Sequence, residues 1–340
     1  MKDISIIIVN YNGIGFIEGC LESIMKHLGS RGTVNSRAGN GSTGSGSIDF
    51  EVIIMDNAST DGSTAYIRSF CLENKEFRLI EMGSNTGFGM ASNKGAGSAA
   101  GRFLLFLNPD CKISDGNMGP LLKYYKDSEN PGIIGVKIKG EKGLLQYSCR
   151  AFPTPARQFY ESYFLCRIFP KNRVSGSYFM SWWDHLTPRE VDWLSGSFML
   201  VDRKLFMDFG GFSTDYFMYS EDTDLCLRLY RNSRKNYYYP DYCIEHADSG
   251  IASRDMAVRE SEIWKNRRLY FLKNYSPVHA AVLSFLYFTG IINRIIVFGT
   301  ASLFSAKIRN QGRVSRYTGA LKKYFSAGRQ TDQQQTGRRK

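Results

Sequence analysis

Short runs of almost uninterrupted apolar residues recur through the first 110 positions of the chain. They occupy residues 4–9, 51–55 and 102–107, with a more mixed run at 77–82. Runs of this kind are typical of strands covered by helices on both faces of a parallel sheet. The segments between them have helical patterns, at residues 16–28, 63–72 and 88–100. The alternation predicts an α/β fold of Rossmann-like type, a mostly parallel sheet with flanking helices.

The pattern changes further along the chain, and the changes divide it into regions. Residues 28–48 are rich in Gly and Ser and almost free of apolar side chains, which predicts a flexible insertion. Aromatic residues crowd the weakly patterned stretch 144–190, which we interpret as a substrate-facing region, with a plain aromatic core as the alternative. We therefore expect three parts, a main domain at 1–250, a helical region at 251–306 and a disordered basic tail at 307–340.

Polar residues follow several of the predicted strands, at the edge of a parallel sheet where ligands bind. Asn10-Tyr11-Asn12 follows the first strand, Asp56-Asn57 the second and Asn108-Pro109-Asp110 the fourth. Pro109 has no N–H to donate to a ladder, so the strand ends there and Asp110 lies at the rim. Plain turns use the same residue types, so each stretch alone is also explained by a turn.

Three more acids gather at the predicted start of a later helix. Glu221, Asp222 and Asp224 follow Ser220, which is a suitable N-cap, and the helix dipole favours acids in a first turn. Capping alone would explain them. Before this helix, residues 191–201 predict a strand broken at Gly196-Ser197, and after it residues 237–240 predict a last strand.

Composition and charge narrow the class of protein. The seven cysteines include no CxxC pair, which favours a reducing compartment and argues against a cysteine metal site. The apolar run at 4–9 is too short for a signal peptide, so we expect a cytoplasmic catalytic part. Much of the net charge of +12 lies in residues 307–340, which hold ten Lys and Arg against one acid, Asp332.

One motif favours a different enzyme class. Residues 13–19 read GxGxxxG, close to the dinucleotide-binding fingerprint, and Asp56 ends the next strand as a ribose-binding acid would. An NAD(P)-dependent oxidoreductase is therefore the alternative function. Against it, Asn10-Tyr11-Asn12 separates the strand from the first glycine, and the acid lies far beyond the usual spacing. It also leaves Asn108-Pro109-Asp110 and Glu221-Asp222 unexplained.

Five motifs in order make a stronger case. They are residues 7–13 (IIVNYNG), 56–63 (DNASTDGS), 85–95 (NTGFGMASNKG), 107–110 (LNPD) and 219–225 (YSEDTDL). Together the motifs resemble family 2 of the inverting glycosyltransferases, with the GT-A fold, and within it the bacterial rhamnosyltransferase-like branch. The resemblance covers roughly residues 3–250 and implies a GT-A catalytic domain at 1–250 with a C-terminal hydrophobic helical appendage.

The resemblance implies a binding site for a nucleotide-sugar donor. The implied donor-binding residues are Asn10, Tyr11, Asn12, Asp56, Asn57, Asn85, Gly87, Phe88, Asn93, Lys94 and Asn108. Asp56 is suited to accept the N3–H of a uracil or thymine ring, and Tyr11 to stack on that ring. The resemblance makes dTDP-rhamnose the leading expected donor, followed by UDP-linked sugars.

The resemblance also implies a metal cofactor, Mg²⁺ or Mn²⁺, held by Asp110 and His246 on the donor diphosphate. Hard oxygen ligands suit such ions. Asn108 occupies the place of the first acid in the Asp-x-Asp motif of the family, which is a departure from the pattern. The strand therefore delivers one carboxylate where relatives deliver two.

Transfer requires that an acceptor hydroxyl lose its proton. By resemblance Asp222 is the candidate general base, with Asp224 as the alternative, and Glu221 orients or contacts the acceptor. Trp193, Gly196 and Ser197 are expected to line the acceptor side. The expected acceptor is a hydroxyl of a lipid-linked glycan in surface polysaccharide biosynthesis.

The longest apolar stretch lies near the end of the chain, at residues 278–299, and contains Arg294. Insertion scales assign an arginine at the bilayer centre a cost of about 2.5–3.5 kcal/mol, which makes a simple span unfavourable. We expect a helix in the interface, backed by the basic tail on anionic lipid, and a peripheral position at the cytoplasmic face of the cell membrane. A span, a buried core helix and an oligomer contact are the alternatives. No nucleic-acid partner is expected, because few aromatic residues accompany the basic tail.

Overall fold

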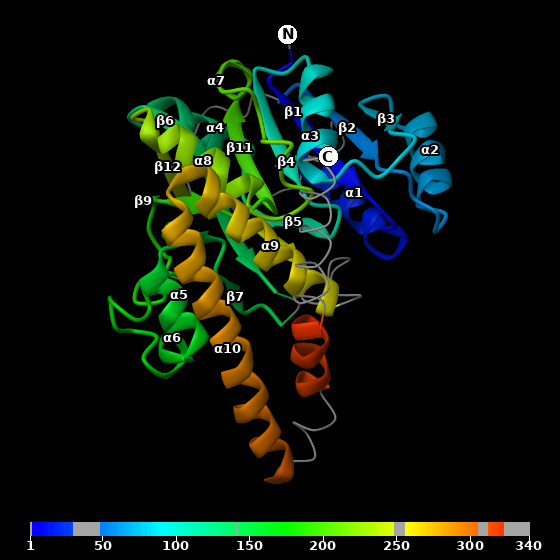
Figure 1. Cartoon of the computed structure of the whole chain (residues 1–340). Coiled ribbons are helices and arrows are strands. Elements are labelled where there is room, and N and C mark those ends of the chain that lie inside the picture. Colours follow the sequence, from blue (N-terminus) through cyan, green and yellow to red (C-terminus); the bar gives the residue numbers. More distant parts are fainter. Residues whose placement is uncertain (1, 30–47, 141, 248–255, 305–311, 323–340) are drawn as a thin grey trace, which may run out of the picture. The chain divides into compact units, whose positions relative to one another are not determined.

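The computed structural model describes residues 2–29, 48–140, 142–247, 256–304 and 312–322 (Figure 1). The predicted insertion lies outside these residues apart from 28, 29 and 48, and so does the predicted tail apart from 312–322. Contacts divide the chain into two compact units, each described here by itself. The first unit comprises Met1–Phe152, Trp183–Phe217 and Glu221–Ile251, and the second comprises Pro153–Trp182, Met218–Ser220 and Ala252–Lys340.

The first unit is built on a mixed ten-stranded sheet. Its strand order is β3-β2-β1-β4-β11-β6-β12-β5, with β7 beside β6 and β9 beside β12, while β8 and β10 form a separate pair. The strands are β1 Ile4–Asn10, β2 Phe50–Asp56, β3 Phe77–Glu81, β4 Phe103–Leu107, β5 Cys111–Asp115, β6 Pro131–Lys139, β7 Leu145–Gln146, β8 Cys149–Arg150, β9 Arg189–Val191, β10 Trp193–Leu194, β11 Phe198–Asp202 and β12 Lys235–His246. The four predicted strands β1 to β4 are mutually parallel, and β6 and β12 run the same way. The predicted α/β class with a mostly parallel sheet is confirmed, and β5, β7, β9 and β11 add antiparallel strands.

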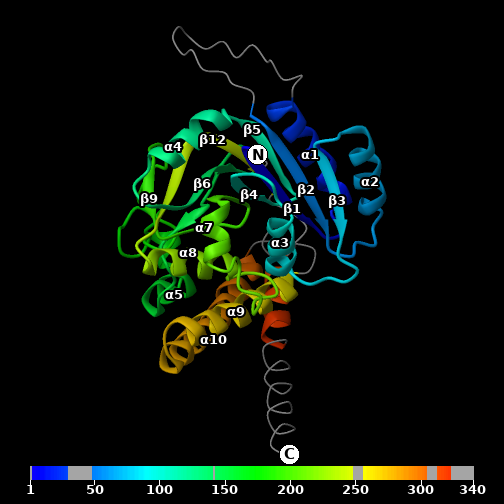
Figure 2. The same cartoon turned by 90° about the horizontal axis from the view of Figure 1, so that it is seen from above.

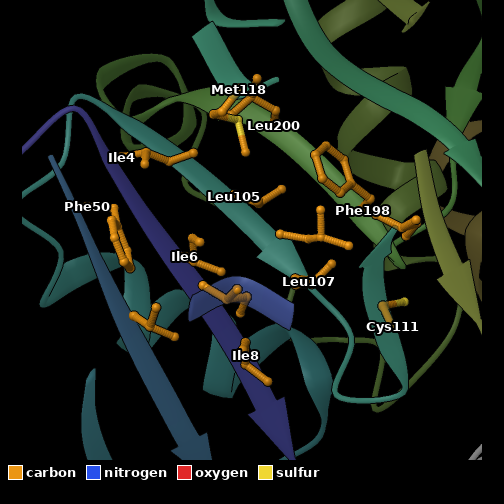
Figure 3. Close-up of a cluster of buried hydrophobic side chains, with 14 of the residues drawn as sticks. Ile4, Ile6, Ile8, Phe50, Leu105, Leu107, Cys111, Met118, Phe198 and Leu200 are labelled. Carbon is orange, nitrogen blue, oxygen red and sulfur yellow. The ribbon is translucent and has the colours of Figure 1, made fainter. Parts of the chain in front are cut away.

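Helices cover both faces of this sheet. Those of the first unit are α1 Ile14–Leu28, α2 Ser63–Glu73, α3 Phe88–Gly97, α4 Met118–Asp127, α7 Arg203–Asp208 and α8 Glu221–Arg231. Ile4, Ile6 and Ile8 point to the face where Leu105 and Leu107 also lie (Figure 3), and α1, α2 and α4 pack there. Figure 2 shows α3, α7 and α8 on the opposite side. The uninterrupted apolar runs of β1 and β4 are explained by this double cover.

The last strand is longer than the sequence predicted. β12 continues through Pro240 to His246, whereas the pattern predicted a strand at 237–240. Its pairing with β6 shifts register between Tyr239 and Cys243, and a bulge of this kind accommodates the proline without a ladder bond. Beyond the bulge β12 pairs antiparallel with β5, so that His246 lies opposite Cys111. Beyond the bulge, His246 therefore lies next to Cys111, the residue that follows Asp110.

The second unit is helical. Its helices are α5 Pro155–Ser162, α6 Leu165–Ile168, α9 Met256–Asn274 and α10 Pro277–Phe304. By length and composition α10 is apolar enough to cross a membrane, and only 17% of its most apolar window is buried. Arg294 is turned toward this unit, since its guanidinium donates to the Glu161 carbonyl at 3.0 Å and lies 5.4 Å from the centre of the Phe164 ring. The charge that argued against a lipid environment therefore has protein partners.

Candidate active site

A carboxylate and an imidazole meet where β4 and β12 end. Asp110 Oδ1 lies 3.4 Å from His246 Nε2, and both side chains are largely buried. Within the described part of the chain, Asp110 Oδ1 has no hydrogen-bond donor, although a buried acceptor without a partner is costly. A divalent cation would satisfy it, and a carboxylate with a neutral imidazole is a suitable donor set. The structure thus brings together the two residues predicted for the metal.

Cys111 is the third potential ligand near this pair. Burial raises the pKa of its thiol well above the usual range, and the thiol contacts the Ser197 carbonyl at 3.6 Å. A protonated thiol is a poor ligand for Mg²⁺ or Mn²⁺, which prefer oxygen. Asn108 stands in the place of the first acid of the Asp-x-Asp motif. It is partly buried, and its backbone N–H donates to the Ser197 carbonyl at 3.2 Å. Asp110 is therefore the one carboxylate of this loop.

Asp222 lies in the first turn of α8 and is held by backbone groups. Its Oδ2 accepts from the Gly196 N–H at 3.1 Å, and its Oδ1 accepts from the Thr223 N–H at 2.7 Å. Burial raises the pKa of the Asp222 carboxyl, and these two N–H groups only partly offset the effect. A carboxylate with a raised pKa is suited to accept a proton.

Its neighbour Glu221 is enclosed more completely, with 5% of its surface exposed. Burial and the charge of Asp222 raise the pKa of Glu221 well above its usual range. Its Oε2 is buried without a hydrogen-bond donor. Ser220, predicted as the N-cap of α8, has φ of 76°, in place of the extended backbone usual for a capping residue. Capping by Ser220 therefore does not account for the acids in the first turn of α8.

Asp224, the alternative base, is used structurally. It is 1% exposed, and its two oxygens accept from the Tyr216 hydroxyl at 3.1 Å and from Arg228 Nε at 2.9 Å. Arg228 also donates to the carbonyls of Phe209 and Gly211, both at 2.6 Å. Asp224 therefore anchors α8 to the preceding loop, and Asp222 is the more accessible carboxylate.

Replacing Arg228 by Ala tests this structural assignment. The change leaves the Asp224 carboxylate buried without its cation, so we expect a loss of about 3 kcal/mol in the free energy of unfolding. Urea unfolding followed by circular dichroism measures the loss. Lys204→Ala is the matched control, because it breaks an exposed ion pair of the same spacing with Asp208 and is expected to cost under about 1 kcal/mol. Equal stabilities of the two variants would contradict the assignment.

The segment Ser195–Ser197 joins the metal loop to the helix that carries Asp222. The Ser197 carbonyl accepts from Asn108, and the Gly196 N–H donates to Asp222. A Cβ added to Gly196 would lie 3.8 Å from Asp222 Oδ2 and 3.9 Å from the Phe88 ring. Both links use backbone groups of the segment between β10 and β11, namely the Ser197 carbonyl and the Gly196 N–H.

Of the predicted acceptor-side residues, Gly196 lies beside Asp222, whereas Trp193 is enclosed. Trp193 is 5% exposed and its indole N–H donates to the Ala151 carbonyl at 3.0 Å. Arg150 covers its ring at 5.0 Å from the centre. Trp193 therefore lies beneath this side, and Arg150, which is partly exposed, is a group that sequence reasoning missed.

The strand ends of β1 and β2 form a polar network around Asp56. Asp56 Oδ1 accepts from Asn10 Nδ2 at 3.0 Å and from the Ser59 hydroxyl at 2.6 Å. Its Oδ2 accepts from the Ser59 N–H at 3.1 Å and from the Thr64 hydroxyl at 3.0 Å. These four bonds fill the acceptor positions of the carboxylate. Direct contact of Asp56 with a base therefore requires a hydroxyl to turn away, and the role stays a prediction.

A pocket of about 530 Å³ adjoins this network, within the usual size of ligand sites. Its lining includes Asp56, Ser59, Thr64, Arg68 and Glu81. The predicted residues Tyr11 and Asn12 lie on the loop after β1, where Tyr11 is 39% exposed and Asn12 Oδ1 accepts from the Thr60 N–H at 2.7 Å. The pocket and an exposed aromatic ring thus flank the same loops.

Asn57 ties the next predicted segment to this edge. Its amide donates to Asn85 Oδ1 at 2.9 Å and its Oδ1 accepts from the Thr86 N–H at 3.0 Å. Gly87 has φ of 81°, and a Cβ there would lie 2.3 Å from the Phe217 carbonyl oxygen, so only glycine fits. Residues 85–88 are therefore held beside Asn57, and their role in donor binding stays a prediction.

The structure does not bring Asn93 and Lys94 to this edge. The Asn93 amide bonds the N–H and carbonyl of Phe212, at 2.9 and 2.8 Å, and so fixes a loop. Lys94 is exposed in the last turn of α3, about 9 Å along the axis from Phe88 at 1.5 Å per residue. The predicted contact of these two side chains with the donor stays a prediction.

Comparison with known proteins identifies the family. Residues 5–206 match the model described as Glycosyl transferase family 2. The chain belongs to glycosyltransferase family 2. It is 30% identical over 239 residues to the N-acetylglucosaminyl-diphospho-decaprenol L-rhamnosyltransferase of Mycobacterium tuberculosis, covering 66% of this chain and 75% of that protein. It is 33% identical over 145 residues to the rhamnosyltransferase WbbL of Escherichia coli, covering 42% of this chain and 52% of that protein.

The predicted rhamnosyltransferase-like branch of glycosyltransferase family 2 is thereby confirmed. Among solved structures, the mannosyltransferase PcManGT of Pyrobaculum calidifontis, in complex with GDP-Man and Mn²⁺, has a TM-score of 0.54 at 16% identity. The match covers 95% of this chain and 88% of that chain, and it supports the GT-A fold.

Family membership removes the oxidoreductase alternative, and the structure gives the reason. Gly15 and Gly19 lie inside α1, and a Cβ on Gly19 would meet only the Lys112 side chain. A dinucleotide fingerprint instead places its glycines where backbone approaches the pyrophosphate. The GxGxxxG pattern of residues 13–19 therefore belongs to a helix of this glycosyltransferase.

Proposed function

We propose that this glycosyltransferase catalyses metal-dependent, inverting transfer of a sugar from a nucleoside-diphosphate donor to a hydroxyl group. One observation carries the proposal, the backbone link through Ser195–Ser197 between the loop of Asp110 and the carboxylate of Asp222. A site for a donor diphosphate and a base for an acceptor are thereby held at one sheet edge. Direct displacement at the anomeric carbon requires both groups and inverts its configuration.

The residues have separate roles in this proposal. Asp110 and His246 hold Mg²⁺ or Mn²⁺, which when bound stabilises the charge that develops on the leaving diphosphate, an effect of several kcal/mol. Asp222 accepts the proton of the attacking hydroxyl, and Glu221 orients the acceptor beside it. The loops with Asn10–Asn12, Asp56–Asn57 and Asn85–Phe88 receive the nucleotide.

The donor is proposed to be dTDP-rhamnose, and the acceptor a lipid-linked glycan of surface polysaccharide biosynthesis. Support comes from two relatives, an L-rhamnosyltransferase that acts on N-acetylglucosaminyl-diphospho-decaprenol and the rhamnosyltransferase WbbL. The partly exposed Arg150 guanidinium near Asp222 is suited to an acceptor that carries phosphate.

A donor screen tests the proposal. Thermal shift with dTDP- and UDP-sugars, with and without Mn²⁺, is expected to show stabilisation by a nucleotide sugar that depends on Mn²⁺. Incubation with that donor and a polyprenyl-diphosphate-linked sugar is then expected to give a product of inverted anomeric configuration by NMR. Stabilisation by NAD(H) alone, or retention of configuration, would overturn the proposal.

We further propose that α10 rests in the apolar part of a membrane surface, at the cytoplasmic face. Its exposed side carries Val278, Phe285, Ile296 and Leu303, each more than half exposed. Arg294 is the single Lys, Arg, Asp or Glu residue of the helix, and it is satisfied by Glu161 and Phe164. The exposed side of α10 carries no charge, which suits contact with lipid. A helix that packs against another helix in water usually carries charged residues beside its apolar seam.

Flotation with phosphatidylglycerol-containing liposomes checks the membrane proposal. The wild type is expected to float, and the double variant Phe285→Glu with Ile296→Glu to remain at the bottom, because each charge must leave water to bind. Leu72→Glu is the matched control, since Leu72 is an 83% exposed apolar residue on α2 of the first unit. Equal flotation of the double variant and the wild type would contradict a role for α10.

A further inference from the structure

His246 is contacted on both ring nitrogens by groups of different kinds. Its Nε2 faces Asp110 Oδ1, and its Nδ1 lies 2.9 Å from Gln146 Oε1. The amide nitrogen of Gln146 donates to the His246 carbonyl at 3.2 Å, so one side chain grips the residue twice. No motif singled out Gln146, which lies one hundred residues earlier in the chain.

These contacts determine the tautomer of the imidazole. The amide nitrogen of Gln146 faces a carbonyl, which only accepts, so the amide oxygen must face His246 Nδ1. An amide oxygen also only accepts, and Nδ1 therefore carries the proton. In the neutral ring the lone pair is then on Nε2, directed toward Asp110. This tautomer differs from the Nε2–H form that would donate to the carboxylate.

A lone pair opposite a carboxylate is unfavourable unless a cation lies between them. Asp110 Oδ1 is buried without a hydrogen-bond donor from any residue that the structure describes, which agrees with this arrangement. Metal-binding histidines commonly donate their other N–H to an oxygen that fixes the ring. Gln146 occupies the position of such an oxygen donor.

The sheet explains how Gln146 reaches His246. In β7 Gln146 pairs with Ile138 of β6, and in β12 Glu245 pairs with Lys139 of the same strand. Gln146 and His246 therefore lie on either side of β6 at nearly the same level. The side chain is positioned by strand pairing, and its place does not depend on a mobile loop.

We propose that Gln146 is a positioning residue for the metal, which holds His246 as an Nε2 donor beside Asp110. The inference rests on the proposed metal-dependent transfer and adds a residue that touches neither donor nor acceptor. It predicts an effect on metal affinity that is separate from folding. Replacing Gln146 by Ala frees the ring to rotate and to take the Nε2–H tautomer.

Mn²⁺ binding to the full-length chain tests the inference, measured by electron paramagnetic resonance of free Mn²⁺ with and without dTDP or UDP. Loss of a group that orients a metal ligand typically weakens binding about 10–100-fold, which is the expected result for Gln146→Ala. Gln146→Glu keeps an oxygen acceptor for Nδ1 and is expected to retain most of the affinity. Leu145→Ala, the neighbouring truncation in β7, is the control for strand integrity and is expected to bind as the wild type does.

The tautomer itself gives a second readout without metal. Long-range proton–nitrogen NMR spectra of the metal-free protein are expected to show His246 protonated on Nδ1, and on Nε2 in Gln146→Ala. The His246→Gln spectrum assigns the signal among the four histidines. Wild-type Mn²⁺ affinity and tautomer in Gln146→Ala would overturn the inference, as would an absence of Mn²⁺ binding by the wild type. If Mn²⁺ binding depends on Gln146 but the wild-type protein transfers no sugar, the proposed function is overturned and the inference about Gln146 is not.

Discussion

The Asp222→Asn protein is expected to bind the nucleotide-sugar donor normally and to lose transfer by about 10²–10⁴-fold, the usual contribution of a general base. The amide has nearly the same shape as the carboxylate and leaves α8 in place, but it cannot accept a proton from the acceptor. Asp222 makes its bonds with Gly196 and Thr223, neither of which is a predicted donor-binding residue. The measurements are donor affinity by calorimetry and turnover with saturating acceptor.

Asp215→Asn is the matched control, because Asp215 is an exposed acid in the loop before α8. It is expected to leave both donor binding and turnover unchanged. Normal turnover by Asp222→Asn would contradict the base assignment. A loss of donor binding together with turnover would show instead that the substitution disturbs the nucleotide loops.

The same assignment gives the pH dependence a definite sign. The base acts when deprotonated, and burial raises the pKa of the Asp222 carboxyl. Activity of the wild type is therefore expected to fall as the pH is lowered through this raised pKa, at a higher pH than an ordinary aspartate would give. The residual activity of Asp222→Asn is expected to lack this limb in a plot of kcat/KM against pH.

Replacing Asp110 by Asn is expected to abolish Mn²⁺-dependent donor binding and to reduce transfer by at least about 10²–10³-fold. The estimate follows from several kcal/mol of charge stabilisation by a bound metal, at 1.4 kcal/mol for each tenfold change in rate. Asp110 is the one carboxylate of its loop, because Asn108 replaces the other acid of the motif. The loop therefore has no second carboxylate to take over.

Mn²⁺ affinity and donor affinity with and without Mn²⁺ measure this effect. The matched control is Asp115→Asn, an exposed acid at the other end of β5, which is expected to bind Mn²⁺ as the wild type does. Donor binding without metal is expected to be equal in all three proteins. Wild-type Mn²⁺ affinity in Asp110→Asn would remove Asp110 from the metal site.

The parallel part of the fold was predictable because its signal is local. Each of β1, β2 and β4 is a short apolar run that is followed directly by polar residues. Such a strand is recognised from its own residues and their immediate neighbours in the sequence. The antiparallel strands were not predictable in this way. β7 and β9 have two and three residues, and β12 contains a proline whose bulge depends on the pairing with β6.

Residues of the candidate site were predictable where a sequence motif contains them. They were not predictable where tertiary contacts determine the role of a residue. Motif and resemblance identified Asp110, His246 and Asp222, which the structure places at one sheet edge. Sequence left Asp224 as the alternative base, because only the fold shows that Arg228 occupies its carboxylate. The same limit applies to Gln146, whose role comes entirely from strand pairing.

The backbone links through Ser195–Ser197 have a consequence for engineering of acceptor choice. The spacing between the loop of Asp110 and Asp222 is set by an N–H and a carbonyl, which every residue type except proline supplies. Gly196 leaves ordinary contact distance for a methyl group beside Asp222. The side chain at position 196 is therefore open to small substitutions in a library, and new substrates can be selected there while the spacing of the reacting groups is retained.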